Sequence, residues 1–237
     1  MIIGIVGGTG NMGRGLALRL AKKHDIILGS RDASRAKAVA EEYYQIAKGF
    51  YGLEIQGEIT GDLNEAAARS SDVVIVAVPP QSAVETAQRI KNNLRPDQVV
   101  ISTVVPMERE KKLFKYKPFT DERQVTPISG AEIIAENVQP VPVVSAFQTV
   151  PASYLADLDS ILNIDVLVSG DNEHALEVAS QLIRDIPNLR PLRVGPLSNS
   201  RLVESITPLL LNAAILNNLK DPSIRIVPWL SKDFGKE

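Results

Sequence analysis

Short apolar runs alternate with longer amphipathic stretches over residues 1–150 of the chain. The short runs are rich in Val and Ile and are apolar nearly throughout, as expected of parallel strands covered on both faces. They lie at residues 2–6, 26–28, 73–78, 99–105 and 141–146. Helix-like stretches lie between them, at residues 11–23, 33–47, 82–93 and 129–137. This order predicts an α/β protein with a Rossmann-type doubly wound parallel sheet.

Two segments break this alternation, and the pattern changes after residue 151. Residues 53–59 alternate like a half-exposed strand, and residues 107–127 predict a polar surface excursion. Further along, the pattern predicts two short strands, one amphipathic helix, and a long apolar helix interrupted at Pro208, at residues 166–169, 192–194, 172–186 and 198–219. We therefore expect a larger domain at residues 1–150 and a small C-terminal α/β domain at 151–237 that packs against it.

Composition excludes several classes of chemistry. The 237 residues include 26 Lys and Arg against 28 Asp and Glu, so no basic field favours nucleic acid as a partner. The chain has no cysteine and two histidines, which excludes disulfides, thiolate nucleophiles and cysteine metal sites, and no metal site is predicted. The N-terminal run lacks a basic flank, and the uncharged stretch 137–156 contains three prolines. A cytoplasmic protein without membrane contact is the expectation.

A glycine loop follows the first predicted strand. Residues 4–13 read GIVGGTGNMG, in which Gly8, Gly10 and Gly13 fit the dinucleotide fingerprint G-x-G-x-x-G. One glycine permits the tight turn, one lets the backbone approach a pyrophosphate, and one allows close packing of helix on strand. The helix that follows offers its N-terminus to phosphates. The alternative is a glycine-rich turn that binds no ligand.

The end of the second strand indicates which dinucleotide binds. NAD-binding proteins carry an acidic residue there, whereas this strand ends in Ser30 and Arg31. Arg35 falls one helical turn beyond Arg31, so two guanidinium groups and a hydroxyl surround one place. This pattern favours the 2′-phosphate of NADP(H). Arginines that are merely solvated are the alternative.

The same loop also fits the G-x-x-G-x-x-G spacing of short-chain dehydrogenases, which use a Tyr-x-x-x-Lys pair. Tyr44 and Lys48 have that spacing. They lie at the end of the helix after the second strand, on the adenosine side, far from a nicotinamide. We interpret Tyr44 as helix packing and Lys48 as surface.

Three further places carry candidate chemistry at the carboxyl edge of the sheet or in the last helix. Val78 and Pro79 end the fourth strand and should border the nicotinamide. Gln148, a polar residue in an apolar run, either orients a carboxamide or second ring or is a satisfied buried amide. Arg201 shares a helix face with Ser205 and either holds an anionic or carbonyl-rich ring or is structural.

Two longer motifs carry a family resemblance. The run I-V-G-G-T-G-N-M-G-R-G-L-A-L-R-L, followed by G-S-R, lies near the start, and G-P-L-S-N-S-R-L-V-E-S-I-T-P-L-L-L-N lies near the end. Together they resemble the NADPH-dependent reductases of coenzyme F-420, also called F-420H2:NADP oxidoreductases. The resemblance implies an NADP-binding Rossmann domain, a C-terminal domain that completes a deazaflavin cleft, and a homodimer.

Site residues follow from that resemblance, motif by motif. It implies pyrophosphate contacts at Thr9, Gly10, Asn11 and Met12, and 2′-phosphate contacts at Ser30, Arg31 and Arg35. It places Val150 and Ala152 at the nicotinamide, and Arg201, Ser205 and Thr207 at the deazaflavin.

The chain departs from the family pattern at two positions. Members carry His where this chain has Gln148, and an aromatic residue where it has Pro80. The lysines of residues 111–117 either meet the acidic tail of the coenzyme or form a solvated basic loop.

The implied reaction is reversible hydride transfer between NADP(H) and coenzyme F-420, which depends chiefly on approach and orientation of the two rings. On this hypothesis Arg201 stabilises negative charge that develops on the deazaflavin. Alternatives are another NADPH-dependent reductase, acting on imines or ferric iron, and a non-enzymatic NADP(H)-sensing module.

Overall fold

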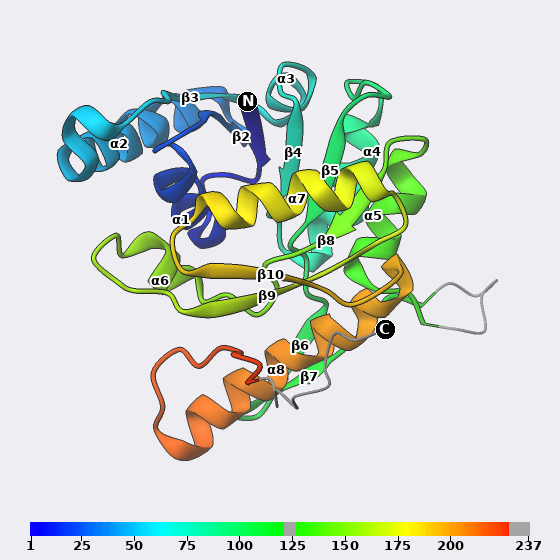
Figure 1. Cartoon of the computed structure of the whole chain (residues 1–237). Coiled ribbons are helices and arrows are strands. Elements are labelled where there is room, and N and C mark those ends of the chain that lie inside the picture. The colour runs from blue at the N-terminus through cyan, green and yellow to red at the C-terminus, as the bar shows by residue number, and fades with distance from the viewer. Residues whose placement is uncertain (121–126, 228–237) are drawn as a thin grey trace, which may run out of the picture.

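The computed structural model describes residues 1–120 and 127–227 of the chain. Eight strands form one sheet in the order β10-β9-β8-β5-β4-β1-β2-β3 (Figure 1). Neighbouring strands run parallel except for β8 and β9, which are antiparallel. The strands are β1 (Ile2–Val6), β2 (Asp25–Ser30), β3 (Ile59–Leu63), β4 (Val73–Val76), β5 (Val99–Ser102), β8 (Val143–Ser145), β9 (Ile164–Gly170) and β10 (Leu189–Arg193).

Helices cover both faces of this sheet. They are α1 (Asn11–Leu20), α2 (Ala33–Tyr51), α3 (Asn64–Arg69), α4 (Ala83–Lys91), α5 (Gly130–Val138), α6 (Ala152–Ala156), α7 (Glu173–Asp185) and α8 (Ser200–Asn217). Alternate residues of the fully buried β4 point to opposite faces, so Val73 and Ile75 join one core cluster and Val74 and Val76 the other. The first cluster packs under α1, α2 and α7, and the second under α3, α4 and α5. The predicted doubly wound α/β fold is confirmed.

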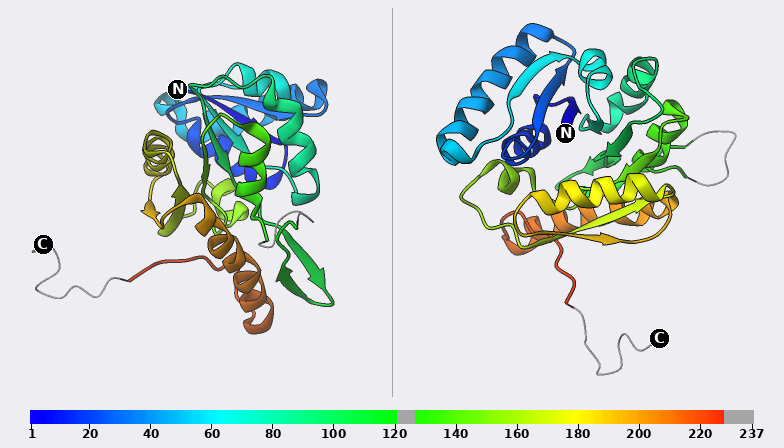
Figure 2. Two further views of the ribbon diagram at one scale, coloured as in Figure 1. Left: turned by 90° about the vertical axis from the view of Figure 1, so that its right-hand side faces the viewer. Right: turned by 45° about the horizontal axis from the view of Figure 1, so that its top comes forward.

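The C-terminal half extends the same sheet. Strands β9 and β10 continue it beyond β8, and α7 covers them (Figure 1). Helix α8 and the hairpin of β6 (Met107–Glu110) and β7 (Leu113–Tyr116) project together from one side of the sheet (Figure 2). The division into two domains near residue 150 stays a prediction.

Several local expectations differ from the observed elements. The predicted strand at 53–59 is a 3-10 turn (Gly52–Glu54), and strand β3 begins only at Ile59. The strand prediction for residues 53–59 is therefore wrong except at Ile59, because so short an alternating pattern does not fix where an element begins. Helix α8 continues through Pro208, which therefore does not interrupt it. The excursion at 107–127 contains the β6–β7 hairpin, and residues 121–126 of it lie outside the described residues.

No helix in the described ranges has the length and apolarity that crossing a lipid bilayer requires.

Candidate functional site

A cavity of about 360 Å³, here called the nucleotide cavity, lies at the carboxyl ends of β1, β2 and β4. The sheet order reverses here, because the chain leaves β1 first for β2 on one side and later for β4 on the other. The cavity is lined by Gly7, Thr9, Gly10, Ser30, Arg31, Asp32, Arg35, Asn64, Ala77, Val78, Pro79, Ser82 and Thr86. Seven predicted site residues meet in it: Thr9, Gly10, Ser30, Arg31, Arg35, Val78 and Pro79.

The glycine loop has the geometry of a phosphate cradle. Gly7 has a φ of +75°, which favours glycine, and its N–H donates to Asn64 Oδ1 at 3.0 Å. A Cβ on Gly13 would lie 2.3 Å from the carbonyl oxygen of Gly8, so α1 approaches the loop as closely as glycine allows. No side chain caps α1 at Gly10, which leaves its first N–H groups for an anion. Gly8 and Gly13 thus shape the loop without lining the cavity, and Asn11 also lies outside its lining.

The two arginines expected to bind a 2′-phosphate have no competing acidic partner among the described residues. Arg31 and Arg35 are exposed, and neither forms an ion pair with another described residue. Asp32 is the N-cap of α2, where its Oδ1 accepts from the N–H groups of Ser34 (2.8 Å) and Arg35 (3.1 Å). Its carboxylate is therefore engaged with the helix rather than with the guanidinium groups.

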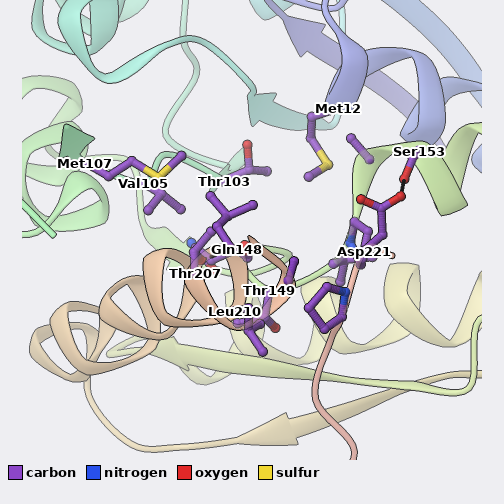
Figure 3. A pocket seen from close by; sticks show the side chains of 16 residues that line it. Met12, Thr103, Val105, Met107, Gln148, Thr149, Ser153, Thr207, Leu210 and Asp221 are labelled. Atoms are coloured by element: carbon purple, nitrogen blue, oxygen red, sulfur yellow. Dashed lines mark hydrogen bonds between the residues drawn. The ribbon is translucent and has the colours of Figure 1, made fainter. Parts of the chain in front are cut away.

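A second, largely apolar cavity of about 420 Å³ lies between the start of α1 and helix α8, and Figure 3 shows the side chains around it. We call it the apolar cavity. It is lined by Met12, Thr103, Val105, Met107, Gln148, Thr149, Val150, Pro151, Ala152, Ser153, Thr207, Leu210, Leu211, Ala214, Asp221 and Pro222. Five predicted site residues line it: Met12, Gln148, Val150, Ala152 and Thr207.

Gln148 is held rigidly in the wall of the apolar cavity. Its Nε2 donates to the Ser102 carbonyl and to Ser145 Oγ, both at 2.8 Å. Its buried Oε1 has no hydrogen-bond partner among the described residues, so this acceptor is left unsatisfied in the cavity wall. Thr207 Oγ1 donates to the Gln148 carbonyl at 2.9 Å and links α8 to the same wall.

Arg201 and Ser205 lie outside the lining of the apolar cavity. Arg201 borders a different hollow on α5, where its guanidinium donates to the Pro127 carbonyl and forms an ion pair with Glu132 at 3.4 Å. Ser205 Oγ donates to the Leu202 carbonyl of its own helix at 2.7 Å. The structure thus brings Thr207 and Gln148 together, and the roles of Arg201 and Ser205 stay predictions.

Glu204 is a fully buried carboxyl that the sequence analysis did not select. It accepts from the N–H groups of Gly130 (2.8 Å) and Ala131 (3.0 Å) at the start of α5, and from the Tyr116 hydroxyl (3.0 Å). Burial raises the pKa of Glu204 to about 7, against the opposing effect of these hydrogen bonds. The same residue joins α8, α5 and the β6–β7 hairpin. Nothing in an isolated Glu within a helix signals such a contact.

The lysines of the β6–β7 hairpin are exposed, and two of them have acidic partners within the hairpin. Lys115 pairs with Glu110, and Lys117 Nζ lies 2.5 Å from Glu108 Oε2. The turn lysines, Lys111 and Lys112, have no ion pair among the described residues. Both interpretations of this segment stay open.

With this geometry described, comparison with known proteins decides the family. A family model for NADP oxidoreductases that depend on coenzyme F-420 matches residues 2–106. An F-420-dependent NADP reductase of Methanocaldococcus jannaschii is 38% identical over 95% of this chain and 98% of that protein. One of Methanothermobacter thermautotrophicus is 35% identical over 95% of this chain and 94% of that protein. The chain belongs to the F-420-dependent NADP oxidoreductase family.

The fold agrees with this membership in the F-420-dependent NADP oxidoreductases. A crystal structure of a candidate F-420-dependent NADP reductase from Arthrobacter superposes with a TM-score of 0.73 over 96% of this chain and 99% of that one. Its sequence identity of 20% makes this a likeness of fold alone. The resemblance stated from the sequence motifs is confirmed by the relatives.

The structure of this F-420-dependent NADP oxidoreductase adds candidate site residues that the sequence motifs did not indicate. Asn64 holds the glycine loop, and Thr103, Asp221 and Pro222 line the apolar cavity. Asn64 directly follows β3. Its place as a polar residue just after the carboxyl end of a strand could therefore have indicated it from the sequence. The other three meet only through the fold. Within residues 1–120 and 127–227, no group of three or more His, Asp or Glu side chains is placed to hold a metal.

Proposed function

We propose that this chain transfers a hydride reversibly between NADP(H), bound in the nucleotide cavity, and coenzyme F-420, bound in the apolar cavity. One observation carries the proposal: the start of α1 contributes to both cavities, with Thr9 and Gly10 in one and Met12 in the other. A dinucleotide whose phosphates meet the glycine loop can therefore place its far end at the apolar cavity. Both coenzymes supply the same chemistry when bound, a ring carbon that gives or takes a hydride.

The residues of the nucleotide cavity fit the phosphates of NADP(H). The uncapped N-terminus of α1 offers N–H groups and a positive dipole end to the pyrophosphate. Arg31 and Arg35 offer unpaired guanidinium groups to the 2′-phosphate, and Ser30 Oγ lies beside them. These contacts bind and orient the dinucleotide, and they leave the reacting end to other residues.

The residues of the apolar cavity fit a flat ring system with polar edges. Val150 and Ala152 provide an apolar wall that excludes water from the place of transfer. Gln148 Oε1 offers a fixed acceptor for a carboxamide or ring N–H, and this fit rests on its lack of any other partner. Thr207 holds the Gln148 main chain in place. Arg201 and Ser205 stay proposed for the deazaflavin side, because they precede the cavity residue Thr207 on the same helix.

We propose further that two copies of the chain associate through α8. Leu202, Leu209 and Leu216 follow one another at intervals of seven and are 68%, 64% and 69% exposed, so they form one apolar stripe. The helix lies at the edge of the molecule, where a second copy has access to it (Figure 2). Exposed apolar stripes of this kind are typical of association surfaces.

The domain boundary near residue 150 and a cytoplasmic location belong to the same proposal. Residues 1–150 would bind NADP(H), and residues 151–237 would complete the deazaflavin cleft through α6, α8 and the segment that follows α8.

An optical assay tests the reaction. The protein is mixed with NADPH and oxidised F-420, and the visible absorbance of the deazaflavin is followed; we expect it to disappear, and NADH to support the reaction poorly. The same protein is offered cyclic imines and ferric chelates as acceptors. Turnover of either of these without F-420 reduction favours another reductase. Tight NADPH binding with no turnover of any acceptor favours a sensing module.

A further inference from the structure

Arg19 is a buried residue of α1 that binds a distant segment of the chain. Its side chain is 5% exposed, and its guanidinium donates hydrogen bonds to four main-chain carbonyls more than 130 positions along the sequence. The carbonyls are those of Tyr154 (3.1 Å), Leu155 (3.1 Å), Asp157 (2.6 Å) and Ser160 (3.0 Å). They belong to α6 and the turn after it, where the last carbonyls of a helix lack partners within the helix; the Asp157 carbonyl also accepts from the Ser160 N–H at 3.1 Å. Arg19 therefore caps α6 from another element.

A second contact fixes the same two helices at close range. A Cβ on Gly15, one turn before Arg19, would lie 2.4 Å from Leu155 Cβ. Leu155 is itself fully buried. Helices α1 and α6 thus approach as closely as a glycine permits. The hydrogen bonds of Arg19 hold the end of α6 against the last turn of α1.

Each of these helices carries one wall of the proposed reaction site. Helix α1 begins at the glycine loop and places Met12 in the apolar cavity. Helix α6 begins at Ala152, and residues 150–153 line the same cavity. The distance between the bound dinucleotide and the opposite wall therefore depends on how α1 sits against α6. Hydride transfer is sensitive to this distance, since a displacement of about 1 Å can slow an enzyme by roughly a hundredfold.

If the contact between α1 and α6 supplied packing alone, an apolar side chain would suit it better than the guanidinium of Arg19. Among the described residues, no carboxylate forms an ion pair with Arg19, and burial lowers its pKa. A buried cation is unfavourable unless hydrogen bonds compensate it, and an apolar side chain avoids this cost. The Nε and Nη2 groups of this planar guanidinium, however, reach four carbonyls at defined angles, which sets direction as well as distance.

We propose that Arg19 is a positioning residue for hydride transfer: it fixes the α6 wall relative to the dinucleotide held at the start of α1. The proposal rests on the proposed function for the identity of the reaction. It concerns a residue that touches neither coenzyme, because Arg19 lines neither the nucleotide cavity nor the apolar cavity.

Three variants test it: Arg19→Met, which keeps the stem and removes the donors, Arg19→Lys, which keeps a charge and fewer donors, and His24→Gln as a matched control. His24 lies just after α1, is 8% exposed, and joins Asp185 of α7 at 2.9 Å, but it lines neither cavity. For each folded variant the measurements are the single-turnover rate of hydride transfer from NADPH to F-420, the Kd of NADP⁺, and amide hydrogen exchange of residues 150–160 with and without NADP⁺.

We expect Arg19→Met to slow hydride transfer by at least roughly tenfold while the Kd of NADP⁺ changes less than about threefold. Exchange at 150–160 should rise in this variant, and NADP⁺ should no longer protect the segment. The rate of hydride transfer in Arg19→Lys should lie between those of the unaltered chain and Arg19→Met. His24→Gln should transfer hydride at the original rate, even with a lower Tm.

A folded Arg19→Met or Arg19→Lys protein with the original rate and exchange would overturn the proposal. Equal slowing in His24→Gln would also overturn it, because loosening anywhere would then suffice. If the unaltered chain reduces no F-420, the proposed reaction fails, and the exchange measurements alone decide whether Arg19 couples the two walls.

Discussion

Arg31 is the single side chain that we propose selects the coenzyme. It lies at the end of β2, where the acidic residue of NAD-binding proteins is replaced by Ser30, and it has no ion-pair partner in the described ranges. An exposed guanidinium gains little from solvent alone, so we propose a bound 2′-phosphate as its partner in this cavity.

We expect Arg31→Ala to weaken NADP⁺ binding by roughly tenfold or more, since a charge-assisted hydrogen bond contributes about 1.5–3 kcal/mol. Binding of NAD⁺, which has no 2′-phosphate, should change much less. Isothermal titration of both coenzymes measures the two affinities. Arg184→Ala, on the outer face of α7 beside Glu177, is the matched control and should change neither. Equal losses for NAD⁺ and NADP⁺ would contradict this role.

Glu204 couples the protonation of one carboxyl to the stability of the fold. Burial raises its pKa from an ordinary 4.5 to about 7, so the folded chain holds this proton more tightly than the unfolded chain. Its contribution to stability is therefore complete below about pH 4.5 and declines as the pH rises towards about 7.

Glu204→Gln should remove this dependence. The free energy of unfolding of the unaltered chain, relative to the variant, should fall by up to about 3 kcal/mol between pH 4.5 and pH 7. Urea titrations of both proteins across this range measure it. Glu173→Gln, at an exposed position on α7, should give a profile parallel to that of the unaltered chain. Parallel profiles for Glu204→Gln would show that burial does not govern this carboxyl.

Among the elements, helix α1 is the one whose packing most affects the proposed site. Its N-terminus faces the nucleotide cavity, its glycines contact the loop and α6, and its last turn carries Arg19. Glycines are unfavourable inside helices, so their presence at Gly13 and Gly15 reflects close approach rather than helix formation.

A pair of Gly→Ala changes separates these two effects. At Gly13 a Cβ would lie 2.3 Å from the Gly8 carbonyl oxygen, whereas at Gly49 in α2 nothing lies within 4 Å. Gly13→Ala should destabilise the chain by about 1–3 kcal/mol and weaken NADP⁺ binding. Gly49→Ala should stabilise it by about 0.5–1 kcal/mol and leave binding unchanged. Thermal unfolding and NADP⁺ titration compare the two. A stabilised Gly13→Ala protein would mean that the loop relaxes freely.

At the scale of the whole molecule, the antiparallel pairing of β8 with β9 brings the last third of the chain back to the site. This last third of the chain continues the sheet. It also places α8 and the residues that follow α8 beside the apolar cavity. The outward stripe of α8 is left uncovered by the described chain.

If that stripe joins two copies, a charge on it should separate them. We expect light scattering to find a dimer for the unaltered chain and a monomer for Leu209→Glu, because burying an unpaired carboxylate is strongly unfavourable. Leu53→Glu is the control: Leu53 is exposed in the 3-10 turn that follows α2, and its substitution should leave the dimer intact. A monomeric unaltered chain, or a dimeric Leu209→Glu protein, would exclude this interface.

The sequence by itself determined the fold class, the family and the dinucleotide loop. Each of these depends on runs of residues close together in the chain, where periodicity and glycine spacing act locally. The strand, glycine turn, helix and Arg31 of the dinucleotide loop fall within residues 2–35, and the family motifs are short runs near the two ends of the chain. The weaker alternating signal at 53–59 placed a strand too early in the chain, because so short a local pattern also fits a turn and a loop.

Only the tertiary structure decided how the rest of the site is assembled. Met12, Gln148 and the pair Thr207 and Asp221 come from three distant parts of the chain, and Arg201 lies near Thr207 in sequence but borders another hollow. Their meeting depends on strand order and helix packing, and so does the hold of Arg19 on α6. No local pattern records such contacts, because the pairing of distant segments is fixed by the shared core that they bury together.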